Sequence, residues 1–265
     1  MSKVDSMTQP PSKSVKTIVH IGAGYGRDID AWLDAGVARV ILAEPDPRLA
    51  SDLRRRYASE PRVSIHEAAI AGKNGPATLR LYNFAGANSL RKSERLADRF
   101  PNLRKIEERN IEALGINDFI RSLALKSGDE NTLVVSAPGE EGALITALTS
   151  IKLARTFTDI VVQAYGEPLY NGHKSPDEIA ALLKNAGFDV DISTDDGVDP
   201  RICAHRGAEL EKMTVEIDEI KEAAQKSAAA LQEHEYRQKM AAKEFARLEG
   251  QLALIKDVLI RERSD

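Results

Sequence analysis

Residues 19–30 read VHIGAGYGRDID, an apolar run followed by Gly22, Gly24 and Gly26 and then by a helix-like stretch. Glycine has no Cβ atom, so it permits tight turns and lets a ligand approach the main chain closely. A strand that runs into a glycine-rich turn and then into a helix is typical of nucleotide-binding α/β proteins. The segment therefore predicts a strand, a turn and a helix with a ligand held at the turn.

An acidic residue follows the next apolar run, in ILAEPDP at residues 41–47. Glu44 lies about 20 residues beyond the glycine turn, where an acid at the end of the second strand accepts hydrogen bonds from the hydroxyls of a ribose. An exposed acid at a strand end is the simpler alternative. The combination of this acid with the glycines favours a ligand that contains a nucleoside.

The spacing of the glycines discriminates between nucleoside ligands. A dinucleotide motif runs G-x-G-x-x-G, whereas Gly26 comes one position earlier than that pattern requires, which disfavours NAD and an oxidoreductase. No lysine of the P-loop type follows the glycines, which disfavours ATP.

Short β-branched runs alternate with helical stretches from residue 16 to about residue 206, which predicts a mostly parallel sheet with helices on both faces. Residues 188–194 and 201–206 flank the turn-rich stretch DDGVDP, so we expect them to form an antiparallel pair. The remaining predicted strands are residues 17–21, 39–44, 62–70, 77–83, 131–137 and 159–165, and the predicted helices are residues 27–35, 47–59, 141–153 and 175–185.

Several motifs occur in the order and at the spacing of a known family: IGAGYG, AEPDP, EAAIAGKNGPATLRLY, GANSL, IVVQAYGE and DEIAALLKNAGFDV. With them, the chain from Val15 to Arg206 resembles the FkbM-type branch of the class I S-adenosylmethionine-dependent methyltransferases. The resemblance implies a Rossmann-like, mostly parallel sheet that ends in an antiparallel strand pair. It also implies S-adenosylmethionine as the cofactor.

The same resemblance assigns roles to individual residues. It implies that the three glycines at 22, 24 and 26 border the methionine part of the cofactor and that Glu44 holds its ribose. Glu67, Ala68 and Ala69 would flank the adenine. His20 stands where these enzymes commonly carry an acid that meets the cofactor's amino group, and a neutral imidazole offers no charge-assisted contact of that kind.

Two further segments depart from the family pattern. Residues 133–145, LVVSAPGEEGALI, lack the lysine and aspartate of a KIDVEGAE-like segment, and Gln163 replaces an acid. With His20, these neutral residues favour a degenerate methyltransferase fold that serves as a scaffold. The glycines and Glu44 favour an active S-adenosylmethionine-dependent O-methyltransferase that acts on a hydroxyl of a sugar, glycan or small metabolite.

Reactive groups are expected in the loops that follow the parallel strands, because ligands of open α/β sheets bind at the carboxyl ends of the strands. One such loop offers Glu140 and Glu141, and another, YGEPLYNGHKS at residues 165–175, offers Glu167 and His173. We expect His173 or Glu167 to remove a proton from the acceptor hydroxyl. The alternative for His173 is a polar loop residue without a catalytic role, which the low number of histidines favours. No second ligand at a metal-like spacing accompanies it, so no metal is expected.

The pattern changes after residue 207. Apolar residues recur at alternating spacings of three and four with charged residues between them, which predicts a coiled-coil helix of about 80 Å. We expect residues 207–265 to pair with another copy of the chain or with a coiled-coil partner protein, although the helix could instead fold back on the preceding domain. The seam consists of Leu210, Met213, Ile217, Ile220, Ala224, Ser227, Leu231, His234, Gln238, Ala241, Phe245, Leu248, Leu252, Ile255, Leu259 and Glu262.

The composition excludes several classes of protein. The chain has 265 residues and a formal net charge of −4, which disfavours a nucleic-acid-binding protein. Cys203 is its one cysteine, so no disulfide framework forms and a reducing cytoplasmic location is expected. No apolar run is long enough to span a membrane. Residues 1–15 are polar, and we expect a disordered tail there, followed by a domain over residues 16–206 and the coiled coil.

Overall fold

The computed structural model describes residues 17–126, 129–194 and 199–261, so the tail predicted at residues 1–15 lies outside the described residues. Contacts divide the chain into two compact units, one up to Thr214 and one from Val215 onward.

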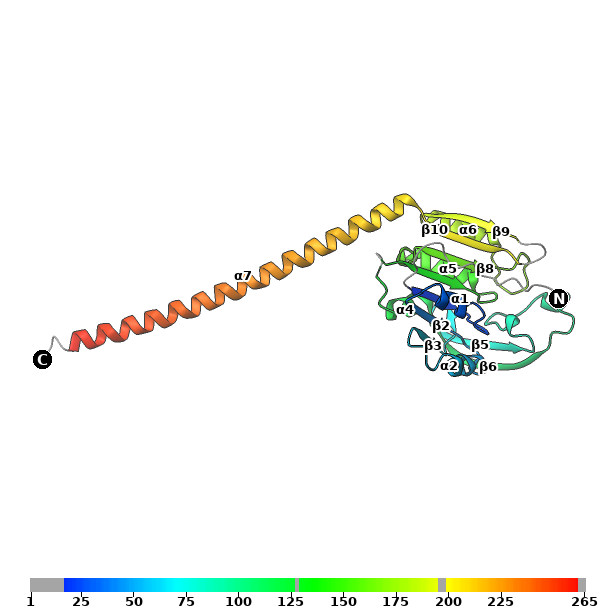
Figure 1. Ribbon diagram of the computed structural model, residues 1–265, viewed down its shortest axis with the longest axis horizontal. Helices are drawn as coiled ribbons and strands as arrows, with labels where there is room; N and C mark the ends of the chain where they lie inside the picture. Colours follow the sequence, from blue (N-terminus) through cyan, green and yellow to red (C-terminus); the bar gives the residue numbers. More distant parts are fainter. Residues whose placement is uncertain (1–16, 127–128, 195–198, 262–265) are drawn as a thin grey trace. The chain divides into compact units, whose positions relative to one another are not determined.

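The first unit is organised around a seven-stranded sheet in the order β3-β2-β1-β7-β8-β10-β9 (Figure 1). Its first five strands are parallel, whereas β10 runs antiparallel to both β8 and β9. This order confirms the predicted Rossmann-like fold of the class I methyltransferase type. The strands are β1 (Thr17–Ile21), β2 (Arg39–Ala43), β3 (Val63–His66), β7 (Asn131–Val135), β8 (Asp159–Gln163), β9 (Phe188–Ser193) and β10 (Arg201–Arg206).

Helices cover both faces of this sheet. All five residues of β1 are buried, and they alternate between two hydrophobic clusters as the pleat requires. Val19 and Ile21 join the cluster of α4, α5 and α6, whereas Ile18 joins the cluster of α1 and α2. The helices are α1 (Ile29–Asp34), α2 (Pro47–Arg56), α4 (Ile116–Ser122), α5 (Glu141–Ser150), the short η2 (Leu153–Thr156) and α6 (Pro176–Asn185).

A second, three-stranded sheet has the order β4-β6-β5. It consists of β4 (Ile70–Ala71), β5 (Gly75–Tyr82) and β6 (Lys105–Gly115), with η1 (Ala85–Ala87) and α3 (Leu96–Arg99) between the last two strands. The sequence pattern does not predict β6, and it joins β3 and β4 into one strand over residues 62–70. This sheet matters for function because the segment between β5 and β6 forms one wall of the site described below.

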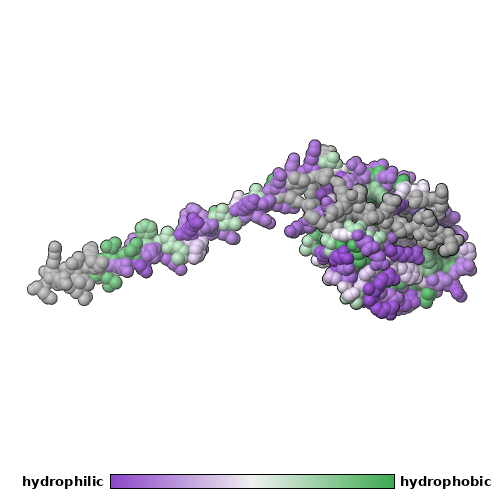
Figure 2. All heavy atoms as spheres, in the orientation of Figure 1, coloured by the Kyte–Doolittle hydropathy of each residue, from purple (hydrophilic) through white to green (hydrophobic). Residues whose placement is uncertain are grey.

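The C-terminal helix α7 (Ala208–Arg261) is continuous over 54 residues, with apolar patches between hydrophilic ones along its surface (Figures 1 and 2). Seam residues whose side chains the structure describes are exposed, among them Leu231 at 61% and Phe245 at 70%. The side chains predicted for the seam at Leu210, Met213, Ile255, Leu259 and Glu262 lie outside the described part of the chain.

Cys203 is a partly buried residue of β10 with a free thiol. Among the helices of the described residues, none combines the length and the apolar character needed to cross a membrane.

Candidate functional site

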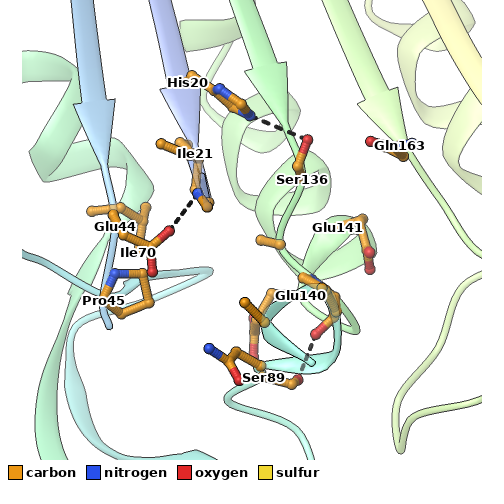
Figure 3. A pocket seen from close by; sticks show the side chains of 18 of the residues that line it. His20, Ile21, Glu44, Pro45, Ile70, Ser89, Ser136, Glu140, Glu141 and Gln163 are labelled. Carbon is orange, nitrogen blue, oxygen red and sulfur yellow. Dashed lines mark hydrogen bonds between the residues drawn. The ribbon is translucent and has the colours of Figure 1, made fainter. Parts of the chain in front are cut away.

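A cavity of about 350 Å³ opens at the carboxyl ends of the parallel strands (Figure 3). The loops that follow β1, β2, β7 and β8 line it, together with the segment between β5 and β6. Seven of the residues predicted to bind the cofactor are in its wall: His20, Gly22, Gly24, Gly26, Glu44, Ala68 and Ala69.

Glu44 is the most constrained of these residues. Its side chain follows β2 and is only 4% exposed, and its two oxygens each accept a backbone hydrogen bond, Oε2 from Gly24 at 2.7 Å and Oε1 from Asp46 at 2.8 Å. Burial raises the pKa of this carboxyl to about 7, although both backbone amides favour its charged form. The glycine turn and the acid, which are 20 residues apart in sequence, therefore form one hydrogen-bonded unit.

The three glycines serve different purposes. All three have positive φ, and a Cβ atom on Gly22 would lie 2.1 Å from the carbonyl oxygen of Ser136. A Cβ atom on Gly26 would lie 2.5 Å from Ile29 Cδ1. A Cβ atom on Gly24 would meet nothing within 4 Å. At Gly22 and Gly26 a side chain would therefore collide with neighbouring atoms of the protein. At Gly24 the space beside the main chain is open, so a ligand can approach it there.

His20 lies at the end of β1 with its ring edge-to-face against Trp32, at 5.6 Å between centroids. Its Nε2 atom is 3.2 Å from Ser136 Oγ, and its buried Nδ1 atom has no hydrogen-bond partner among the described residues. Burial lowers the pKa of this imidazole to about 4. His20 is therefore neutral near pH 7 and does not repel a cation.

Two adjacent acids follow β7 at the start of α5, and both are 5% exposed. Glu140 is neutralised by Arg91, with Nε–Oε1 at 2.5 Å and Nη2–Oε2 at 3.2 Å. Glu141 makes no ion pair with any described residue. Burial, more than the charges of Glu140 and Asp199, raises the pKa of Glu141 to about 8.

The segment between β5 and β6 is tied to the main sheet by its own polar groups. Ser89 Oγ donates to the carbonyl oxygen of Pro138 at 2.5 Å, and Asn88 Nδ2 donates to Asp46 Oδ2 at 3.3 Å. From the loop after β8, Tyr165 donates to the carbonyl oxygen of Gly86, and Tyr170 donates to that of Ala87, each at 3.1 Å. This wall of the cavity is thus held in place from three sides.

The charge of the cavity wall is predominantly acidic. Asp28, Glu44, Glu140, Glu141 and Asp199 line it, whereas Arg27 is the one basic side chain among its described residues. Asp199 is paired with Arg99 and Glu140 with Arg91, but Glu44 and Glu141 have no basic partner in the described part of the chain. The formal charge of such a wall disfavours anions, and a ligand that carries positive charge would favour the ionised forms of Glu44 and Glu141.

Three residues predicted from the sequence do not line the cavity. Glu67 pairs at the surface with Arg54, at 2.8 Å between Oε2 and Nη1. Glu167 is exposed and His173 is partly buried in the loop after β8, and neither is part of the wall. The catalytic assignment of Glu167 and His173 stays a prediction that the geometry of the cavity does not support.

Other wall residues were not singled out from the sequence. Asp199 comes from the loop between β9 and β10, and Phe84 and Phe100 come from the segment between β5 and β6. No local motif marks them, because tertiary packing alone brings these segments together. In the described residues, no group of three or more His, Cys, Asp or Glu side chains is arranged to hold a metal ion.

No protein-family model matches this sequence, and no curated protein matches it. Solved structures resemble it at low identity. The CurJ carbon methyltransferase is 11% identical with a TM-score of 0.42, over 75% of this chain and 50% of its own. Fibrillarin from Aeropyrum pernix, solved with bound S-adenosylmethionine, is 14% identical with a TM-score of 0.41, over 72% of this chain and 67% of its own.

The mitomycin 7-O-methyltransferase MmcR is 18% identical with a TM-score of 0.38, over 73% of this chain and 49% of its own. This chain thus spans about half the length of CurJ and MmcR. The likeness concerns the fold alone.

Proposed function

We propose that the first unit binds S-adenosylmethionine and transfers its methyl group to a hydroxyl group of a sugar, glycan or small metabolite. The observation that carries this proposal is the position of Glu44 in the cavity wall. A carboxylate has about four acceptor positions, and the amides of Gly24 and Asp46 use two of them. Two acceptor positions remain for the neighbouring hydroxyls of a ribose.

The charge of the wall supports the same ligand. S-Adenosylmethionine carries a sulfonium and an ammonium group against one carboxylate, so it suits the acidic cavity. A dinucleotide would add the negative charges of a pyrophosphate to a wall in which Arg27 is the one basic side chain among the described residues. Such an excess of like charge disfavours binding.

His20 fits the cofactor in its neutral form. With Nε2 3.2 Å from Ser136 Oγ and Nδ1 buried, the neutral ring adds no positive charge near the cofactor's ammonium group. Where the family pattern has an acid, this chain thus has an uncharged ring. Open space beside Gly24 leaves room for the methionine part.

The bound cofactor would supply an activated methyl group and a neutral leaving group. The chain's own residues then hold the acceptor in line with the methyl group and receive the acceptor's proton. The sequence predicts Glu167 or His173 as the base that receives this proton, but neither residue lines the cavity.

We also propose that α7 associates with a second copy of the chain or with a coiled-coil partner. Exposed apolar residues recur along one stripe of the helix at spacings of three and four, including Ile217, Ile220, Leu231, Phe245 and Leu252. A single helix cannot bury such a stripe against itself, so a partner helix would remove it from water.

Calorimetric titration of S-adenosylmethionine and S-adenosylhomocysteine into the full-length protein tests the cofactor site. We expect micromolar binding by the wild type and an affinity at least tenfold weaker in Glu44→Ala, because a hydrogen bond to a charged group contributes about 1.5–3 kcal/mol. Glu112→Gln, which alters an exposed glutamate of β6 outside the cavity wall, is the matched control and should bind normally.

The absence of both heat and thermal stabilisation with either ligand would contradict the proposal. That result would favour a scaffold built on a methyltransferase fold, in which α7 carries the function.

A further inference from the structure

The cavity has two ends that differ in chemistry. Glu44 and Pro45 lie at the carboxyl end of β2, and Gln163 and Glu141 lie across the opening at the ends of β8 and β7 (Figure 3). The strand order places β1, with its glycine turn, and β7 between β2 and β8. If the proposed function is correct and the nucleoside occupies the β2 end, the methyl acceptor must enter at the β8 end.

Aromatic rings gather at the β8 end. Phe84, Phe100 and Tyr165 all line the cavity, and the rings of Phe84 and Phe100 lie 5.7 Å apart. The Arg99 guanidinium lies 5.5 Å from the ring centroids of both Phe100 and Tyr165, and Asp199 holds it there through hydrogen bonds of 2.6 and 3.0 Å. This cluster is therefore fixed in position.

Phe84 is the exception within the cluster, because it remains 46% exposed. The neighbouring η1 is nevertheless anchored by Tyr165 through the carbonyl oxygen of Gly86. A large apolar ring kept exposed on an anchored wall offers contact area to a ligand at low entropic cost. Aromatic partners gain further from offset or edge-to-face packing.

Glu141 is the carboxyl group at this end that lacks a basic partner among the described residues, and the backbone amides of Gly139 and of Glu141 itself hydrogen-bond to it. Arg91 forms an ion pair with Glu140, and Arg99 forms one with Asp199, whereas no described basic side chain pairs with Glu141. The raised pKa of Glu141, about 8, makes it a stronger base than an ordinary carboxylate. A phenolic hydroxyl, with a pKa near 10, is matched to such a base far better than an aliphatic alcohol is.

We infer that the β8 end of the cavity is an acceptor subsite for an uncharged phenol, whose ring packs on Phe84, Phe100 and Tyr165 and whose hydroxyl proton passes to Glu141. In the balanced step, the phenol oxygen forms the new bond to the methyl carbon and the carbon–sulfur bond breaks. The electron pair of the broken bond stays on sulfur, and the hydroxyl proton ends on the Glu141 carboxylate. The methyl donor is the sulfonium compound of the proposed function.

Binding to the full-length protein saturated with S-adenosylhomocysteine tests the subsite without any need for turnover. Three probes are titrated calorimetrically: 2-naphthol, its saturated counterpart decahydro-2-naphthol, and methyl β-glucoside. We expect 2-naphthol to bind at least tenfold more tightly than the other two. Phe84→Ala should abolish that preference and leave the affinity for S-adenosylhomocysteine unchanged.

The outcomes separate the two proposals. Normal binding of S-adenosylhomocysteine with no preference for 2-naphthol, or with a preference for the glucoside, overturns the phenol subsite and leaves the proposed function standing. No binding of S-adenosylhomocysteine overturns the proposed function itself.

The role of Glu141 is read from a probe whose protonation is visible. The absorbance of bound 2-naphthol distinguishes the phenol from its phenolate. Because Glu141 ionises at about pH 8, before a phenol with a pKa near 10, its negative charge shifts the ionisation of a facing phenol to higher pH. Glu141→Gln should lower the ionisation midpoint of the bound probe by at least one pH unit and reduce the rate of 2-naphthol methylation at least 100-fold. An unchanged midpoint would show that Glu141 does not face the hydroxyl. Glu140→Gln is the matched control for Glu141→Gln, because it removes the neighbouring acid, which is paired with Arg91.

Discussion

At the scale of single residues, burial shapes the chemistry of the cavity more than formal charge does. Glu44 and Glu141 have raised pKa values because the wall removes water from their carboxylates, and His20 has a lowered pKa for the same reason. Near pH 7 the site thus contains a neutral imidazole and two carboxyl groups that are close to their midpoints. The protonation states of both carboxyl groups are therefore sensitive to pH near neutrality.

The titration of Glu44 predicts how cofactor affinity depends on pH. Ribose hydroxyls donate hydrogen bonds, so they bind the carboxylate better than the acid, and Glu44 ionises at about pH 7. We expect the affinity for S-adenosylhomocysteine to rise between pH 6 and pH 8 by up to about tenfold per unit below the midpoint.

Calorimetry at pH 6, 7 and 8 measures this slope. Glu44→Gln is the control, since glutamine cannot ionise. In this variant the affinity should depend less on pH, while Glu141 titrates in both proteins. Parallel slopes in the two proteins would show that Glu44 does not contact the ligand.

At the scale of elements, α7 is amphipathic along its length. The exposed stripe is interrupted by polar residues at Ser227, His234 and Gln238, which weaken the centre of the seam. Salt bridges one turn apart, such as Glu233 with Arg237 at 2.5 Å, lie on the exposed helix and contribute little. Association should therefore depend on the apolar residues on either side of the centre.

Substituting two of those apolar residues tests association in the full chain. Burying one Leu or Phe side chain contributes about 1.5–3 kcal/mol, so Leu231→Asp with Phe245→Asp should weaken self-association at least 100-fold. Light scattering should show a multiple of 29.0 kDa for the wild type and about one chain for the double variant.

Lys239→Asp, an exposed position outside the seam, is the control for the added negative charge. A wild-type mass of one chain would contradict self-association and leave a partner protein as the occupant of the stripe. Equal multimeric masses for the wild type and the double variant would show that the stripe is not the contact.

At the scale of the whole molecule, three of the buried titratable groups, Glu44, Glu141 and His20, determine part of the dependence of stability on pH. Each acid with a raised pKa binds a proton in the folded state that the unfolded chain has already released. The free energy of unfolding therefore falls as pH rises from about 4.5 to 7 for Glu44, and from about 4.5 to 8 for Glu141. His20 acts in the opposite direction, but only between about pH 4 and pH 6.5.

We therefore predict that Glu141→Gln becomes more stable relative to the wild type as pH rises from 5 to 8. One such proton contributes at most about 1.4 kcal/mol per pH unit, which corresponds to several degrees in Tm. Thermal unfolding at pH 5, 6.5 and 8 measures the difference. A constant difference across that range would contradict the raised pKa of Glu141.

The sequence by itself determined those features that depend on short-range patterns. Alternating β-branched runs predicted the parallel strands, and turn residues predicted the antiparallel pairing of β9 with β10. The glycines and Glu44 follow the predicted first and second strands and line the cavity, and their roles toward a ligand stay predictions. The strand predictions succeed because turn geometry and the alternation of buried residues follow from neighbouring residues.

Only the tertiary structure decided the rest. The β6 strand, KIEERNIEALG, is rich in charged residues of helix-forming type, and its pairing with β5 makes it a strand. Arg91 neutralises Glu140 from 49 residues away, which leaves Glu141 as the unpaired acid after β7 among the described residues. Side-chain direction beyond a strand end depends on which segments pack there, and no local pattern contains that information. For the same reason Phe84, Phe100 and Asp199 join the wall, while Glu67, Glu167 and His173 lie outside it.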